Sequence, residues 1–310
     1  MKKTLLLAIL LLGIYEGYSQ GCIAVRHMAC AAGRINNSTT ALGEGQWQFT
    51  TGYRYLHSYK HFVGTTEQKH RVEEGTDVRN WSHSFDFGLS YAVNQRLSFS
   101  LNVPYVDNAR SSMYEHYGNS VEANPERKRF YTYSRGIGDM RLTSTYWVLN
   151  PLTHLKGNFA LGVGIKAPTG DANVQGDFYK LDKNKKEYIQ TVNPQTNLSV
   201  PDQYAGRIGL NYNLLPKQGF AVSLGGRIEG LPAIDLIGKS EGSRRPGYIV
   251  SFEPGLIWMD SHHTLALTVP YALIRNRIKS WSDRQDPAGL RHGDAAFADY
   301  FISATYSYRF

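Results

Sequence analysis

The sequence predicts an all-β fold, an antiparallel transmembrane β-barrel of the outer-membrane type with about ten strands. Three observations predict it. Apolar and polar residues alternate with period two from residue 44 onward, most alternating runs are about ten residues long with aromatic ends, and the connections alternate between short and long. Aromatic strand ends are typical of the two interfacial girdles of a membrane barrel. A soluble β-sandwich also alternates, but it needs neither these ends nor repeated charges on its second face.

The composition excludes several classes of protein. The chain has 310 residues, of which 42% are hydrophobic, 13% aromatic and 19% charged, so it is not a disordered chain. Its 2 cysteines exclude a disulfide-dense scaffold and a four-thiolate zinc site. A mean hydropathy of -0.39 excludes a bundle of transmembrane helices. The 30 glycines, 21 tyrosines and 13 phenylalanines favour β structure.

The first residues predict export. Two lysines precede an apolar run over 5–14, which is too short to span a bilayer as a helix and fits a secretory signal peptide. We expect cleavage after Ser19, which lowers the net charge from +8 to +7 because two lysines and Glu16 leave with the signal peptide. A buried helix and a lipoprotein signal ending at Cys22 are the alternatives.

The predicted organisation is a signal peptide over 1–19, an N-terminal periplasmic segment over 20–43 and a β-barrel over 44–310. Because export permits disulfides, Cys22 and Cys30 are expected to form one local disulfide. A metal or haem role is disfavoured, since the sequence has no Cys-x-x-Cys-His motif and no second cysteine pair.

Each alternating run is expected to turn its apolar residues toward lipid and its polar residues toward the barrel interior. In chain order the predicted strands are 47–55, 81–91, 97–105, 140–148, 159–166, 204–213, 220–229, 248–258, 265–273 and 299–310. Glycines inside these strands, among them Gly209, Gly225, Gly226 and Gly255, are expected to relieve crowding on the inner face of a narrow barrel.

The connections predict how the strands cross the membrane. Short turns are expected at Asn94-Gln95, 150–156, 216–219 and 260–263, and long loops at 57–80, 107–136, 168–201, 230–246 and 275–293. Short periplasmic turns and long extracellular loops are typical of outer-membrane barrels, and an even strand number puts both termini in the periplasm. The loop 168–201 contains two short apolar runs around 182–186, so twelve strands are the alternative.

Two local patterns carry specific expectations. Tyr306, Tyr308 and Phe310 alternate up to the last residue and resemble the signal that the barrel-assembly machinery recognises, although an ordinary edge strand can also end in Phe. Val-Pro-Tyr occurs at 103–105 and at 269–271, both expected at extracellular strand ends. Because proline cannot donate to a ladder, both triplets predict a place where pairing stops or bulges.

The inner faces of the predicted strands carry many charges. The candidate lumen-lining residues are Arg54, Asp86, Asp139, Arg141, Lys166, Arg207, Arg227, Glu229, Glu253 and Asp299, with Arg309 near the terminus. They are consistent with a pore that selects polar or anionic solutes. They are also consistent with a packed, salt-bridged interior. We favour this second interpretation, because about ten strands enclose little space. Both interpretations can hold together.

Three stretches resemble the outer-membrane β-barrel family named for the MetA pathway of phenol degradation, whose members are usually called transporters. They are Gly-Ile-Gly-Asp-Met-Arg-Leu at 136–142, Gly-Val-Gly-Ile-Lys-Ala-Pro-Thr-Gly-Asp at 162–171, and Val-Pro-Tyr-Ala at 269–272 with Arg-Asn-Arg at 275–277. The resemblance covers about 40–310 and leaves 21–33 unmatched. It implies passage of small hydrophobic or aromatic molecules across the outer membrane, and it supplies no catalytic residues.

The favoured function is therefore a narrow channel or transporter for a small solute, with no cofactor, metal or catalytic residue expected. A receptor or adhesin is one alternative. The predicted loops hold tyrosines and basic residues, which suit lipopolysaccharide and other anionic neighbours in a Gram-negative outer membrane. Nucleic acid is the wrong partner for this compartment. These loop residues are Tyr114, Tyr117, Tyr131, Tyr133, Arg127, Lys128, Arg129, Arg244, Arg245, Arg275, Arg277 and Arg284.

A lipid or peptide hydrolase is the less favoured alternative. Its candidate residues are His57, His61, His70, His83 and His116, and the sequence has no Gly-x-Ser-x-Gly motif.

Overall fold

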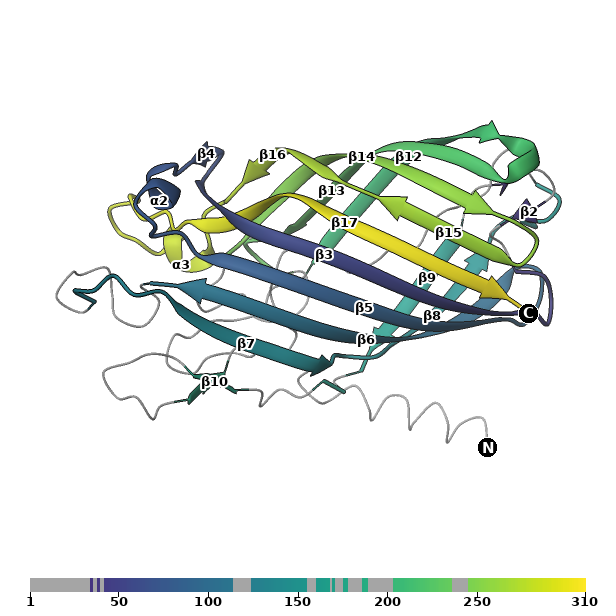
Figure 1. The fold of residues 1–310 in the computed structure, drawn as a ribbon, viewed down its shortest axis with the longest axis horizontal. Helices are drawn as coiled ribbons and strands as arrows, with labels where there is room; N and C mark the ends of the chain where they lie inside the picture. The colour runs from purple at the N-terminus through teal and green to yellow at the C-terminus, as the bar shows by residue number, and fades with distance from the viewer. Residues whose placement is uncertain are drawn as a thin grey trace.

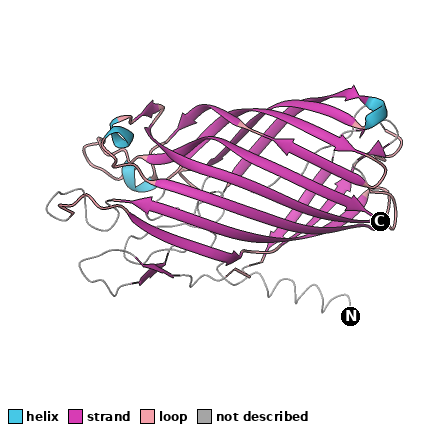
Figure 2. Ribbon diagram, in the orientation of Figure 1, coloured by secondary structure: helices cyan, strands magenta, loops and turns pink. Residues whose placement is uncertain are grey.

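The computed structural model describes residues 42–113, 124–154, 160–167, 169–170, 203–235 and 245–310, together with the short strands at 34–35, 38–39, 175–177 and 186–188. The predicted signal peptide and both cysteines lie outside the described residues. In the described part, strands dominate and the helices are single turns at the two ends of the molecule (Figure 2). None of these helices has the length and apolar character that a membrane span requires.

In the described residues, the main sheet has thirteen strands, of which twelve are long and one, β4 (Thr66–Glu67), is short. The twelve long strands are β3 (Trp47–Val63), β5 (Arg79–Ala92), β6 (Leu97–Ser112), β7 (Phe130–Ile137), β8 (Arg141–Trp147), β9 (Ala160–Lys166), β12 (Tyr204–Leu215), β13 (Phe220–Leu231), β14 (Gly247–Met259), β15 (His263–Thr268), β16 (Tyr271–Asn276) and β17 (Ala295–Arg309). The shorter elements are β1 (Arg34–Ile35), β2 (Ser38–Thr39), β4 (Thr66–Glu67), β10 (Gln175–Asp177), β11 (Lys186–Tyr188), α2 (His70–Glu73), α3 (Trp281–Arg284) and the 3-10 turn Pro216–Gln218.

The main sheet is antiparallel and joins the two ends of the chain. Its strands follow the order β12-β13-β14-β15-β17-β3-β5-β6-β8-β9. The last strand pairs with the first long strand, from Ala295 opposite Phe62 to Arg309 opposite Gln48. The C-terminus lies at the end with the short turns, and β4, α2 and α3 lie at the other end (Figure 1). This arrangement confirms the predicted antiparallel outer-membrane barrel fold. In the loop 168–201, β10 and β11 pair with each other as a separate two-stranded sheet.

The two faces of the sheet are inverted relative to a soluble protein. On β5, Phe85, Phe87 and Leu89 are exposed, whereas the alternate side chains of Ser84 and Asp86 are buried. Other strands repeat this pattern, with large apolar side chains on the exposed outer face. An apolar outer face and a polar inner face are what a barrel in lipid requires. Gly226 departs from our expectation, because it lies on the outer face, opposite Phe252.

Two strands are interrupted where the Val-Pro-Tyr triplets lie. Between β7 and β8, residues 138–140 stand opposite Val103 and Pro104, because Ile137 pairs with Tyr105 and Arg141 with Asn102. Between β15 and β16, Val269 and Pro270 are themselves the interruption. The predicted irregularities are therefore present, but they lie midway along the long strands and not at the extracellular strand ends.

The strands are longer than the alternation suggested. β3 continues to Val63 and β5 begins at Arg79, so the connection between them is shorter than the predicted loop 57–80. Tyr131 and Tyr133 likewise belong to β7 and not to a loop. The alternation of apolar side chains ends where the strands leave the lipid, but the backbone hydrogen bonds between the strands continue further.

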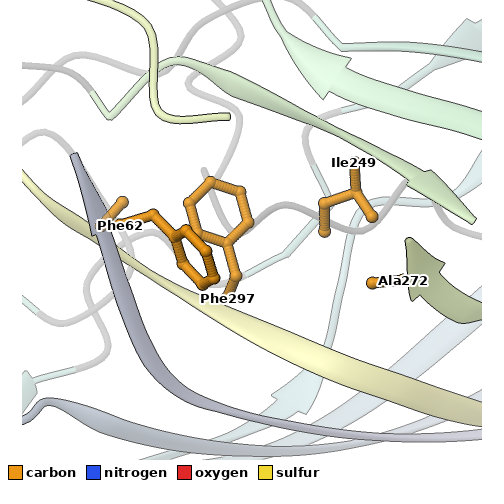
Figure 3. Packing of buried hydrophobic residues seen from close by; sticks show 5 residues of the cluster. Phe62, Ile249, Ala272 and Phe297 are labelled. Atoms are coloured by element: carbon orange, nitrogen blue, oxygen red, sulfur yellow. The ribbon is translucent and has the colours of Figure 1, made fainter. Parts of the chain in front are cut away.

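Buried apolar side chains on the inner face form two clusters. Phe62, Ile249, Ala272, Ala295 and Phe297 form the first, toward the end with α2 and α3, and the rings of Phe62 and Phe297 meet edge to face at 5.6 Å (Figure 3). Ala221, Ile257 and Met259 form the second, near the short turns. A layer of charged residues lies between the two clusters along the strands.

Candidate functional site

Contacts between strands that are not neighbours identify the inner face. Arg207 on β12 binds Glu253 on β14, passing over β13. Arg141 on β8 reaches Asp86 on β5, passing over β6, with Nη2 and Oδ1 3.3 Å apart. Such contacts are possible only on the concave side of a curved sheet. We call the charged residues on this side the inner charge layer, which consists of Arg54, Asp86, Arg141, Arg207, Arg227, Glu229 and Glu253.

The β13–β14 part of the inner charge layer is closely packed. Arg227 donates from Nη2 to Oε2 of Glu229 over 2.7 Å, and its Nη1 lies 4.0 Å from Oε2 of Glu253. The side chains of these three residues are only 5%, 3% and 4% exposed. Buried charges persist only when they are paired, because each one loses its hydration. These three residues therefore form a fixed part of the barrel wall.

The register explains why Glu253 is needed. Arg207 and Arg227 stand directly opposite each other on β12 and β13, and like charges in that position destabilise a sheet. Glu253, on the next strand, contacts both arginines and offsets their repulsion. At the other wall, two cations also stand opposite each other in the register, Arg141 and Lys166, and Arg141 binds Asp86. The side chain of Lys166 lies outside the described residues.

An aromatic ring lies beside these charges. The ring of Phe301 on β17 lies 5.2 Å from the guanidinium of Arg227 and 5.9 Å from that of Arg54. Because β17 and β13 are separated by other strands, this contact crosses the interior. Cations over a ring face are attracted by its quadrupole, and the attraction is stronger where water is excluded. Phe301 was not among the predicted site residues, although its place in the alternation of the last strand could have indicated it.

Asp299 lies nearer the extracellular end than the inner charge layer. It occupies an irregular part of β17, where the register with β3 shifts between Ala298 and Phe301. Its carboxylate binds Lys60 at 2.7 Å and Arg275 at 2.5 Å. Sequence reasoning placed both cations in loops. Continuing the alternation of β3 through Ser58 to Phe62 would have put Lys60 on the inner face.

Asp139 is not on a strand, because it lies in the interruption between β7 and β8. Its Oδ1 accepts a hydrogen bond from the backbone N–H of Gly170 at 3.0 Å. The hydroxyl of Thr169 accepts from the N–H of Met140 at 2.8 Å. Two of the stretches that carry the family resemblance, 136–142 and 162–171, therefore contact each other and bridge this interruption. Their role in this structure is to support the wall.

Glycines next to the inner charge layer allow neighbouring strands and side chains to approach closely. A Cβ atom on Gly225 would lie 2.8 Å from the carbonyl oxygen of Ile208, and one on Gly209 would lie 2.9 Å from that of Leu224. On Gly255 it would meet the hydroxyl of Ser223 at 2.4 Å. These distances are shorter than side chains tolerate, which agrees with the expected relief of crowding.

Among the described residues, the candidate histidines are not arranged as a hydrolase site. His61 is buried and uses both ring nitrogens: Nε2 accepts from the N–H of Val78 at 2.8 Å, and Nδ1 is 2.7 Å from Oδ2 of Asp294. Since Nε2 accepts, Nδ1 carries the proton and donates it. No nitrogen is left to activate a nucleophile, so this Asp–His pair holds the loop after β3 to the segment before β17.

The other candidate histidines are also structural or isolated. His57 stacks on Trp81 and His83 contacts the hydroxyl of Tyr53, both on the outer face. His70 begins the short helix α2, and His116 lies outside the described residues. Ser261 and His262 are hydrogen-bonded neighbours in an exposed turn, where Asp260 accepts from backbone N–H groups and does not orient the imidazole.

Arg309 and Phe310 lie on opposite faces at the end of the barrel. Arg309 is buried and donates to the carbonyl oxygen of Asp260 at 3.4 Å, whereas Phe310 is 59% exposed on the outer face. Tyr308 stacks on Phe310 with the ring centroids 5.9 Å apart. The three aromatic residues of the predicted assembly signal thus face lipid and not the interior.

No protein-family model matches the sequence, and no curated protein matches it either. Among solved structures, the COG4313 outer membrane channel from Pseudomonas putida F1 has a TM-score of 0.52 and 13% identity, over 87% of this chain and 97% of that chain. The translocator domain of the autotransporter NalP from Neisseria meningitidis has a TM-score of 0.37 and 11% identity, over 87% of this chain and 90% of that chain. The monoaromatic hydrocarbon channel CymD has a TM-score of 0.37 and 11% identity, over 87% of this chain and 89% of that chain.

The first of these similarities shows the fold, that of an outer-membrane β-barrel. It agrees with the predicted outer-membrane location, and it does not extend to a particular sequence family. The more specific resemblance to the MetA-pathway family is not confirmed, because no family model matches.

Proposed function

We propose that the protein is a narrow outer-membrane channel for small solutes, with hydrophobic or aromatic molecules as the preferred class. The observation that carries the proposal is the uneven burial of the inner charge layer. Arg227, Glu229 and Glu253 are almost fully buried, but the side chains of Arg141 and Arg207 are 27% and 26% exposed. These two arginines lie on β12 and β8, beside the two edges of the described sheet, so we expect a narrow path near these edges and not through the packed centre.

The chemistry of the interior supports the preferred class. Aromatic and aliphatic side chains around Phe62 and Phe297, together with the ring of Phe301, pack in the interior beside the charges; they are buried, so a solute reaches them only where this packing opens. Arg141, Arg207 and Arg227 are paired with carboxylates, so this part of the inner charge layer does not present a strong field of one sign. Charge selection by a pore needs a ring of unbalanced charge, and this interior instead favours small neutral solutes. The similar fold belongs to a protein described as an outer membrane channel.

Solute-dependent block of ion current tests the proposal. The refolded barrel in a planar bilayer is expected to pass only a small ion current, because its charges are packed. A neutral aromatic solute such as benzyl alcohol should reduce that current more than an aliphatic polyol of similar size. Benzoate reports on the contribution of Arg141 and Arg207, and the variants R141A and R207A should change its effect. A large, unblocked ion current would contradict a narrow apolar path, and no current or flux with any solute would favour the receptor alternative.

A further inference from the structure

The outer face of β3, β5, β6 and β7 changes character at one level. Tyr53, Phe85 and Tyr105 stand opposite one another in the last purely aromatic row. In the next outward row toward the extracellular end, His83 pairs with Asp107, which pairs with Arg135. Asp107 lies ten residues beyond Leu97 on β6, which at the usual rise and tilt is a height of about 25 Å, the thickness of the apolar band of an outer-membrane barrel. This charged row therefore marks the extracellular limit of the hydrocarbon.

Above this limit the outer face carries a row of stacked rings. His57 stacks on Trp81 with centroids 5.0 Å apart and planes 8° apart, and on Tyr59 at 5.0 Å. Trp81 in turn stacks with Tyr131 at 6.4 Å. Strand β6 lies between β5 and β7, and its residues at this level, Ala109 and Ser111, are small. The rings of β5 and β7 can therefore contact each other over β6. We call Tyr59, His57, Trp81, Tyr131 and the neighbouring Tyr133 the ring shelf.

The ring shelf is accessible. Tyr131 and Tyr133 are 49% and 54% exposed, although they lie in a continuous strand. Exposed aromatic side chains at this level are typical of the interfacial girdle of a membrane barrel, which contacts lipid headgroups. In this case the surface lies above the hydrocarbon, at the level of lipid headgroups.

A fixed cation lies next to the ring shelf. Arg79 precedes Trp81 on the same face of β5, and its Nε donates to Oδ2 of the fully buried Asp77 over 2.7 Å. Its side chain remains 38% exposed, so the guanidinium is held in place but still reachable. Asp77 also binds Arg129 at 3.1 Å, so one carboxylate serves two arginines and the group keeps a positive charge. Arg135 is exposed on the lower side of the shelf.

We propose that the ring shelf, with Arg79 and Arg135, binds a phosphorylated glycolipid of the outer leaflet, namely lipopolysaccharide. Sugar rings present apolar C–H faces that lie against aromatic faces, and a guanidinium binds phosphate through two parallel hydrogen bonds. Both chemistries meet here at the height at which the first sugars and phosphates of this lipid lie. The site faces the membrane and is independent of solute passage through the interior.

Lipid retention by the intact barrel tests this site. The protein would be reconstituted in phosphatidylcholine nanodiscs that contain bis-phosphorylated lipid A, and bound lipid would be counted by native mass spectrometry. We expect Tyr131→Ala combined with Arg135→Gln to lower the retained lipid A by about fivefold. Both side chains are exposed, and heat-modifiable migration on gels would verify that the variant is folded. If the double variant does not fold, Arg135→Gln alone is the measurement.

Two controls define the outcome. Arg96→Gln changes an exposed arginine in the turn at the opposite end and should leave retention unchanged. Phosphatidylglycerol, which is anionic but carries no sugar-phosphate headgroup, should be retained less than lipid A by the unmodified protein. Equal retention of lipid A by the double variant and the unmodified protein would overturn the proposal, and so would equal retention of the two anionic lipids.

Discussion

Arg227 and Glu229 lie two residues apart on the inner face of β13 and share a hydrogen bond of 2.7 Å while both are buried. The period of a strand puts these residues on one face, and the register with β14 brings Glu253 to the same place. The pair therefore joins a local pattern, Arg-x-Glu, to a contact that only the assembled sheet creates. Its stability effect distinguishes a packed interior from a water-filled one.

We first predict that Arg227→Ala destabilises the barrel by about 3–5 kcal/mol, because it leaves Glu229 buried without its partner and Glu253 with Arg207 alone. Replacing Arg227 by Met and Glu229 by Leu together should recover part of this loss, since the pair is then removed and not broken. Urea unfolding in phospholipid vesicles, followed by tryptophan fluorescence, measures both. If the single substitution leaves stability unchanged, the interior around Arg227 is hydrated.

A second prediction uses two adjacent glycines that point to opposite sides. Gly225→Ala should lower the free energy of unfolding by about 1–3 kcal/mol, because the added Cβ would meet the backbone of Ile208 on the neighbouring strand β12. Gly226→Ala should be neutral or slightly stabilising, because nothing lies within 4 Å of its Cβ position and alanine lowers the entropy of the unfolded chain. The same unfolding assay compares them. Equal effects of the two substitutions would contradict the inferred crowding of the inner wall.

A third prediction concerns acid and the extracellular loops. Burial alone would raise the pKa of the Asp77 carboxyl, but the hydrogen bond from Arg79 and the charges of Arg129 and Arg79 outweigh burial and hold the pKa below its usual value. The carboxyl of an aspartate in an unfolded chain has a pKa of about 4. Because the pKa of Asp77 is lower in the folded protein, Asp77 stabilises the loop contacts fully above about pH 4, and this stabilisation is lost as the pH falls through the folded-state pKa.

Hydrogen exchange of the backbone over 64–78, corrected for intrinsic rates, should therefore show weaker protection near pH 3 than at pH 7. Asp77→Asn should weaken protection at pH 7 and remove most of the pH dependence, because Arg129 ties this loop to its neighbour through Asp77 and the carbonyl oxygen of Gly75. Glu126→Gln, at an exposed carboxylate, is the matched control. Undiminished protection in the Asp77 variant would show that the contacts do not hold the loop.

The fourth prediction separates barrel assembly from barrel stability. Phe310→Lys should reduce insertion by the assembly machinery more than Phe220→Lys, although both side chains are exposed on the outer face. Arg309 is an unsuitable control, because it is buried and its replacement would also weaken the fold. The fraction of heat-modifiable protein in isolated outer membranes measures insertion. Similar losses in the two variants would mean that the terminal aromatic residue is no special signal.

The fifth prediction concerns Cys22 and Cys30, which lie outside the described residues. If the chain is exported as its first residues predict, the two thiols should be oxidised to one disulfide in the mature protein. Alkylation of denatured, unreduced protein should then add no label, and prior reduction should add two. Labelling of both thiols without reduction would reject the disulfide.

The alternation of side chains predicted much of the fold, and its failures are local. It assigned the outer and inner faces of β5, β13 and β14 correctly, because every second side chain of a strand points the same way. It ended β3 too early, because Tyr59 and His61 are less apolar although pairing continues to Val63. It also placed Gly226 on the wrong face, since a glycine carries no apolar or polar signal of its own.

The sequence by itself determined that the chain forms long antiparallel strands with one lipid-facing side, because period two and lipid exposure act within each strand. It also indicated several of the charges that turn inward, among them Asp86, Arg227, Glu229 and Glu253. Only the tertiary structure decided that Glu253 lies between Arg207 and Arg227, that Phe301 reaches Arg227 across the interior, and that Asp139 supports the wall. Those contacts depend on register and on the curvature of the sheet, which bring together residues far apart in the chain and leave no trace in the pattern of any single strand.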